Sequence, residues 1–191
     1  MCVPMIALCL LTGCGGEAPE VSLRDDYLTM TGCRMEAKVT CGGETETVFT
    51  LRCDYVPEGD TTVEVLAPET AAGVKAILRG EDLTLEYEDV CLPAGTLSAQ
   101  AISPAACLPR LMSALREGWL LEENRERWGD TDCLRLTLDQ TGQEAGKILS
   151  TLWLDLADGT PLRGEIAVDG EIILTAEFTS FAFCDTIDPI S

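Results

Sequence analysis

Apolar and polar residues alternate with a period of two through most of this 191-residue chain. Met35, Ala37 and Val39, for example, alternate with charged residues. The same alternation returns at 49–53, 63–65, 83–88, 119–127, 133–139, 147–156, 162–168 and 171–183. Glycine, proline and aspartate separate these segments at short intervals, as turns require. The pattern is typical of antiparallel strands that bury one face, and it predicts a sheet of consecutive strands.

One helix is predicted before the strands. Ser22 and Asp25 form a capping box, in which a serine is followed three residues later by an acidic residue. Leu23, Tyr27 and Met30 then share one helical face. We expect a short helix over residues 23–31.

A second helix is predicted between two groups of strands. Apolar residues recur at i, i+3, i+4 and i+7 from Leu108 to Leu115. Ser103-Pro104 provides residues suited to the start of the helix, and Gly118 provides the stop. Pro109 cannot donate a hydrogen bond, so the helix either starts near it or is kinked there.

Ten or so antiparallel strands on one chain do not form a flat sheet, because strand twist makes such a sheet curl or split. No linker, repeat or change of composition divides the chain, so we expect one domain over residues 23–191. The fold class is mainly β (α+β), with one N-terminal helix and one inserted helix. The inserted helix can lie against the concave face of the sheet or close an open end.

Charge and composition exclude several functions. The chain has 33 acidic and 13 basic residues, a net charge of −20, and no histidine. With 46% hydrophobic residues it has enough apolar material to fold. Its charge repels nucleic acids, and the missing histidine excludes Ser-His-Asp hydrolysis and histidine-containing zinc sites. The paired acids are explained by turns and solvated strand faces, so we expect no enzyme, no metal and no cofactor.

The N-terminus has the features of an export signal. Residues 3–11 are apolar but too few to span a bilayer as a helix. Leu11-Thr12-Gly13-Cys14 resembles the lipobox of bacterial lipoproteins, in which the cysteine is diacylated. We therefore expect a signal peptide at 1–13, a tether at 14–22, lipidation of Cys14, and an extracytoplasmic protein anchored to the bacterial cell membrane. The alternative is an N-terminal strand of a cytosolic domain.

The ten cysteines form no CxxC motif. Seven remain beyond the expected leader and anchor, so at least one stays free or pairs between chains. If residues 42–44 form a three-residue hairpin loop, Cys33 lies opposite Cys53 and a disulfide between them is possible. The alternative is that the cysteines are buried, apolar thiols.

The segment from Trp153 to Arg163 resembles a hairpin of the LolA/LolB-like superfamily of lipoprotein carriers. The residues that carry this resemblance are Trp153, Asp155, Gly159, Pro161 and Arg163. It implies an incomplete β-barrel of about ten to eleven strands, with helices that plug its mouth and an interior that can hold acyl chains. Clostridial germination lipoproteins, which bind a cell-wall amidase, resemble the same group.

Two functional hypotheses follow. The first is a membrane-anchored carrier or chaperone that binds a lipid or lipoprotein acyl chain. The second is a protein-interaction module that binds or activates a cell-envelope partner such as a cell-wall amidase. An open apolar tunnel favours the carrier, whereas an interior filled by the protein's own side chains favours the module. Ten side chains are expected to line the concave side: Met35, Val39, Phe49, Leu51, Val65, Leu85, Leu108, Leu111, Met112 and Leu115.

Overall fold

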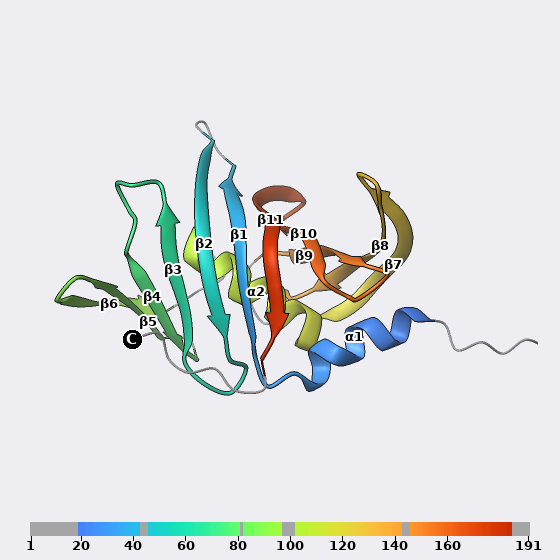
Figure 1. Ribbon diagram of the computed structural model, residues 1–191, viewed down its shortest axis with the longest axis horizontal. Helices are drawn as coiled ribbons and strands as arrows, with labels where there is room; N and C mark the ends of the chain where they lie inside the picture. The colour runs from blue at the N-terminus through green and yellow to red at the C-terminus, as the bar shows by residue number, and fades with distance from the viewer. Residues whose placement is uncertain (1–18, 43–45, 81, 97–101, 143–145, 185–191) are drawn as a thin grey trace, which may run out of the picture.

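A single open antiparallel sheet curls around one helix in the computed structural model (Figure 1). The structure describes residues 19–42, 46–80, 82–96, 102–142 and 146–184. Its elements are α1 (Pro19–Thr29), β1 (Cys33–Cys41), β2 (Thr47–Tyr55), β3 (Thr61–Ala67), β4 (Lys75–Arg79), β5 (Asp82–Tyr87), β6 (Val90–Thr96), α2 (Pro104–Glu117), β7 (Trp119–Trp128), β8 (Thr131–Asp139), β9 (Ile148–Asp155), β10 (Pro161–Val168) and β11 (Glu171–Phe183). The predicted fold class, with about ten to eleven strands and two helices, is confirmed.

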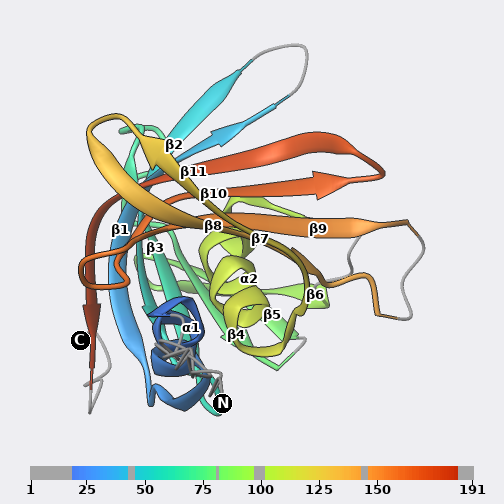
Figure 2. The same ribbon diagram turned by 90° about the vertical axis from the view of Figure 1, so that its right-hand side faces the viewer.

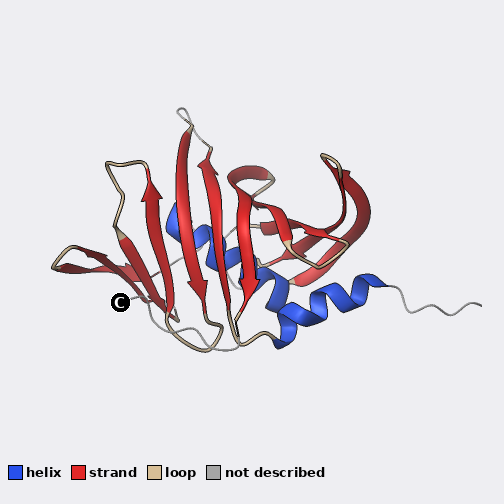
Figure 3. Cartoon of the chain, in the orientation of Figure 1, coloured by secondary structure: helices blue, strands red, loops and turns tan. Residues whose placement is uncertain are grey.

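The strand order is β6-β5-β4-β3-β2-β1-β11-β10-β9-β8-β7. The first and last strands of the chain, β1 and β11, therefore pair at the middle of the sheet. Strands β6 and β7 follow one another in the chain but form opposite edges of the sheet. The segment between them must cross the molecule, and α2 makes this crossing on the concave side (Figures 2 and 3).

Helix α2 begins after Ser103, one of the two starts that the sequence left open, and ends at Gly118, the predicted stop. The Gly118 amide donates to the carbonyl of Ala114 at 2.8 Å. Pro109 lies inside the helix, so the helix continues through it and does not begin there. The predicted apolar stripe is buried against β1–β3 and β8–β11.

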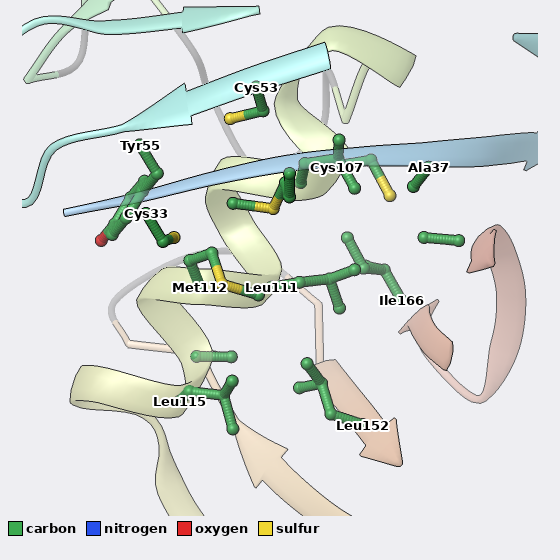
Figure 4. Packing of buried hydrophobic residues seen from close by; sticks show 14 of the residues in the cluster. Cys33, Ala37, Cys53, Tyr55, Cys107, Leu111, Met112, Leu115, Leu152 and Ile166 are labelled. Atoms are coloured by element: carbon green, nitrogen blue, oxygen red, sulfur yellow. The ribbon is translucent and has the colours of Figure 1, made fainter. Parts of the chain in front are cut away.

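The concave face of the sheet carries the apolar member of each alternating pair. One row of directly opposite residues crosses five strands from Met35 through Cys53, Val63 and Ala76 to Leu85. Cross-strand neighbours share a face, so the strand phase predicted for this side is confirmed. Figure 4 shows Leu111, Met112 and Leu115 of α2 pointing into the same core as the sheet residues.

The register of β1 and β2 differs from the prediction. Cys33 lies opposite Tyr55, and Met35 lies opposite Cys53, because the connection between the strands is two residues longer than expected. Shifting the pairing of two strands by two residues leaves every side chain on the same face of the sheet. The predicted faces are therefore correct although the predicted register is wrong. Cys33 and Cys53 are both free thiols, and the expected disulfide is not formed.

The other differences between the predicted and the observed elements are confined to single helices and strands. Helix α1 starts at Pro19 and ends at Thr29, which is earlier than expected at both ends. Strands β4 and β6 were not predicted as separate segments; β6 contains Pro93 and Gly95, which interrupt the strand pattern. Neither helix in the described ranges has the length and apolar character that crossing a bilayer requires. The predicted signal peptide and Cys14 lie outside the described residues.

Candidate functional site

The structure brings the ten predicted ligand-binding residues together on the concave face. Seven of them are fully buried against one another: Met35, Val39, Leu51, Leu108, Leu111, Met112 and Leu115. Phe49, Val65 and Leu85 are half-buried at the border of the same core. The centre of the half-barrel is thus filled by the protein's own side chains.

The contact between α2 and β10 shows how tightly this centre is filled. Gly164 of β10 faces Leu111, and a Cβ atom at Gly164 would lie 2.5 Å from Leu111 Cδ1. This is closer than carbon atoms approach in a packed core. Because Gly164 has no side chain, α2 can lie close to β10 at this point.

A cleft of about 640 Å³ lies beside α2, where the helix faces the ends of β2, β3 and β4. Core residues Tyr55, Leu78 and Ala106 form part of its wall. Ser113 and Glu117 of α2 also line it. The cleft opens to solvent, and part of the hydrophobic core is therefore reachable from the surface at its wall.

Two polar side chains in the cleft have altered acidity. Burial raises the pKa of the Tyr55 hydroxyl to about 12. Hydrogen bonds from Thr141 lower the pKa of Asp139. At neutral pH the cleft therefore contains a neutral phenol and an ionised carboxylate.

Two arginines join the ends of the helices, an arrangement that no pattern in the sequence indicates. Arg24 of α1 donates to the carbonyls of Leu115 and Gly118 at 2.8 and 2.6 Å, at the C-terminal end of α2. Arg116 of α2 donates to the carbonyls of Tyr27, Leu28 and Met30, at the C-terminal end of α1. Each helix supplies the cation that satisfies the last carbonyls of the other.

Arg34 and Arg52, the arginines of the first two strands, lie away from the cleft. Arg34 makes a two-pronged ion pair with Asp54, at 2.6 and 2.9 Å. Arg52 pairs with Glu36 and Glu64. These pairs lie on the convex face, because their positions alternate with the buried residues of β1, β2 and β3.

The Trp153–Arg163 motif forms the β9–β10 hairpin. Trp153 and Arg163 lie opposite one another, and the Arg163 guanidinium lies 4.6 Å from the centre of the Trp128 ring. The Trp153 indole donates to the Glu126 carboxylate. The motif thus fixes a convex-face cluster, which is a structural role.

The remaining motif residues shape the hairpin turn. Asp155 accepts a hydrogen bond from the amide of Ala157, and Asp158 accepts one from Thr160. The bond from Thr160 lowers the pKa of Asp158. The Gly159 carbonyl accepts a 2.6 Å hydrogen bond from the Tyr27 hydroxyl, which ties the turn to α1. Turn formation therefore accounts for both aspartates.

Several cysteines lie in the core. Burial raises the pKa of the Cys33, Cys53 and Cys107 thiols, so these groups are protonated at neutral pH. This fits the second interpretation of the sequence, in which the cysteines are apolar core residues. Within the described ranges, no three His, Cys, Asp or Glu side chains are arranged to hold a metal ion.

No protein-family model matches the sequence, and a search of curated proteins found no significant match. Among solved structures, the chain is similar to an uncharacterized conserved protein from Thermus thermophilus, with 17% identity, 90% of each chain covered and a TM-score of 0.50. It is also similar to a LolA superfamily protein from Nitrosomonas europaea, with 11% identity, 87% of this chain and 92% of that chain covered, and a TM-score of 0.49. A third similar structure is lipoprotein LppX from Mycobacterium tuberculosis, with 13% identity, 88% of this chain and 96% of that chain covered, and a TM-score of 0.48.

At these identities the likeness is one of fold. The chain has the fold of the Thermus thermophilus protein.

Proposed function

We propose that this protein is a non-enzymatic, membrane-anchored extracytoplasmic lipoprotein that binds a lipid or lipoprotein acyl chain. The binding site is the cleft beside α2, whose wall includes part of the hydrophobic core. Cys14 carries the anchor, and the folded domain holds the ligand away from water.

One observation carries this proposal: the wall of the cleft contains side chains of the hydrophobic core. Tyr55, Leu78 and Ala106 belong to both the cleft and the core. An acyl chain that enters the cleft therefore meets core side chains on part of its wall, while Arg110, Glu117 and Asp139 line other parts. The volume of about 640 Å³ lies in the range that ligand pockets occupy. Behind the wall, Met112 and its leucine neighbours can repack around a flexible chain, because methionine adapts readily to new shapes.

The test uses the full-length protein purified without detergent. Oleate is titrated while native mass spectrometry records the bound ligand and a thermal melt records the midpoint. We expect a 1:1 complex and a raised midpoint, since a ligand at 100 times its Kd stabilises the native state by about 2.7 kcal/mol.

Ser113→Trp tests the location of the site. Ser113 lines the cleft and is half-buried, so tryptophan there fills the cleft from the outer side of α2. We expect this variant to fold and to lose oleate uptake, whereas Ser113→Ala retains it. If the wild type stays free of ligand and its midpoint does not move, the carrier proposal fails.

A second candidate is a module that binds a cell-envelope protein. The filled centre of the half-barrel favours it, because Leu111, Met112 and Leu115 occupy the volume that a carrier leaves open. A failed oleate titration with a well-folded protein would leave this candidate in place. Its test is the binding experiment described next.

A further inference from the structure

An apolar strip on the concave face continues beyond the part that α2 covers. Leu85 lies opposite both Ala76 and Leu92, and Tyr87 lies opposite Val90. Ala76 is 2% exposed, whereas Tyr87, Val90 and Leu92 are 49%, 54% and 59% exposed. We call Leu85, Tyr87, Val90 and Leu92 the edge strip. It has the side-chain chemistry of the core but is open to solvent.

The two edges of the sheet differ in character. The other edge strand, β7, carries five charged residues and one asparagine at positions 122–127. Charged residues on an edge strand prevent unwanted association. Strand β6 carries no charged residue over Val90–Thr96, and its hairpin with β5 projects from the body of the molecule (Figure 1). The β6 edge therefore lacks the charged residues that protect the β7 edge.

A partner strand does not fit the β6 edge well. Pro93 lacks an amide hydrogen, and proline on an edge strand interrupts pairing with a further strand. An occupant would instead lie across the side chains of the concave face. A helix fits this position, because α2 already packs on the same face of the neighbouring strands (Figure 2).

The charge of the hairpin selects the partner. The turn of the hairpin carries two exposed acids, Glu88 and Asp89, between Tyr87 and Val90 of the edge strip. The other two acids of residues 82–96, Asp82 and Glu86, alternate with the edge strip and lie on the convex face, opposite Arg79 and Lys75. The chain as a whole has a net charge of −20, so a second copy is repelled, as is an anionic membrane surface. A cationic partner is attracted.

We propose that the edge strip docks an amphipathic helix of a partner protein, with its apolar face on Tyr87, Val90 and Leu92 and its basic side chains toward the hairpin carboxylates. This is a helix-in-groove contact, in which apolar anchors at helical spacing give affinity and charge gives specificity. It goes beyond acyl-chain binding and uses a different surface from the cleft.

The probe is a synthetic helical peptide of about 18 residues, the length of five helical turns, with leucine on one face and lysine on the other. Binding to the full-length protein is measured by fluorescence anisotropy, together with a second peptide in which glutamate replaces lysine. We expect the lysine peptide to bind 1:1 and the glutamate peptide not to bind. Added salt should weaken binding, because it screens exposed charges.

Two pairs of substitutions separate the apolar and ionic contributions. Tyr87→Ser with Leu92→Ser should weaken binding about tenfold or more, as expected for the anchors of an interface. Ile172→Ser is the matched control, since Ile172 is 50% exposed on β11, and it should leave binding unchanged. Glu88→Lys with Asp89→Lys should weaken binding of the lysine peptide and permit the glutamate peptide to bind.

Three results would overturn the proposal. One is equal affinity for both peptides, and another is equal affinity of the wild type and the Tyr87→Ser/Leu92→Ser variant. The third is loss of oleate uptake or of phosphatidylglycerol-vesicle binding in that variant, which would make the strip a lipid site. Loss of oleate uptake in Ser113→Trp with peptide binding retained would separate the two surfaces.

Discussion

Arg24 and Arg116 illustrate how single residues hold the helices of this protein in place. An α-helix leaves its last four carbonyls without internal partners, and here each helix receives a guanidinium from the other. Burial lowers the pKa of Arg24, but the group stays charged because an arginine pKa is far above neutral pH. The contact between the helices thus depends on two side chains that lie far apart in the sequence.

Arg24→Ala should lower the free energy of unfolding by about 1 to 3 kcal/mol, the usual range for hydrogen bonds to a charged group. Arg24→Lys should recover only part of this loss, because lysine cannot reach two carbonyls with a planar fork. Urea unfolding curves provide the measurement. Arg79→Ala is the control: its pair with Asp60 is exposed on both sides, so its loss should cost much less free energy than the loss of Arg24. Equal costs for Arg24→Ala and Arg79→Ala would refute the role assigned to Arg24.

At the scale of elements, α2 and β10 meet at Gly164. The helix can approach the sheet because this position has no side chain, and Leu111 occupies the space. Leu111 is fully buried, so its methyl groups have no free volume to move into. The separation of helix and sheet is therefore set by this pair.

Gly164→Ala should destabilise the protein by about 1 to 3 kcal/mol through overpacking. Leu111→Ala alone should cost about 2 to 5 kcal/mol because it leaves a cavity. The double variant should be more stable than the sum of the two single effects predicts, since the added methyl group fills part of that cavity. Thermal or urea unfolding of the wild type, the two single variants and the double variant gives the four free energies that this double-mutant cycle needs. Simple additivity would show that Gly164 and Leu111 do not constrain each other.

At the scale of the whole molecule, the sheet stays open because β6 and β7 form separate edges. The helix that connects them occupies the concave side, so one connection both crosses the molecule and fills its centre. Function is therefore expected at the borders of this filled centre: the cleft beside α2 and the edge strip. The anchor proposed at Cys14 concerns the chain outside the described residues.

Cys14→Ala should release the protein from membranes or leave it as an uncleaved precursor. A domain with a net charge of −20 is not attracted to an anionic bilayer, so its retention depends on acyl chains. Fractionation of cells that express either form, with mass spectrometry of the N-terminus, gives the answer. Membrane retention of both forms with an intact leader would exclude the lipobox interpretation.

Local patterns in the sequence were enough to predict which faces of the strands are buried and where α2 ends. Both depend on residues close together in the chain: alternation sets the face of a strand, and a glycine directly after the apolar stripe marks the end of a helix. The resemblance to the LolA/LolB-like superfamily could also be found from a local pattern, because the residues that carry it form one hairpin.

The tertiary structure decided the remainder. A shift of two residues between β1 and β2 leaves the buried faces unchanged, so alternation could not fix that register. Arg24 and Arg116 find their partners across the fold, and no local pattern predicts such contacts. Whether the concave face is filled or open depends on how closely α2 approaches the sheet, and Gly164 allows an approach in which Leu111 occupies the space beside β10. Burial of a strand face is a local property of the sequence, whereas the volume between two elements is a property of their packing.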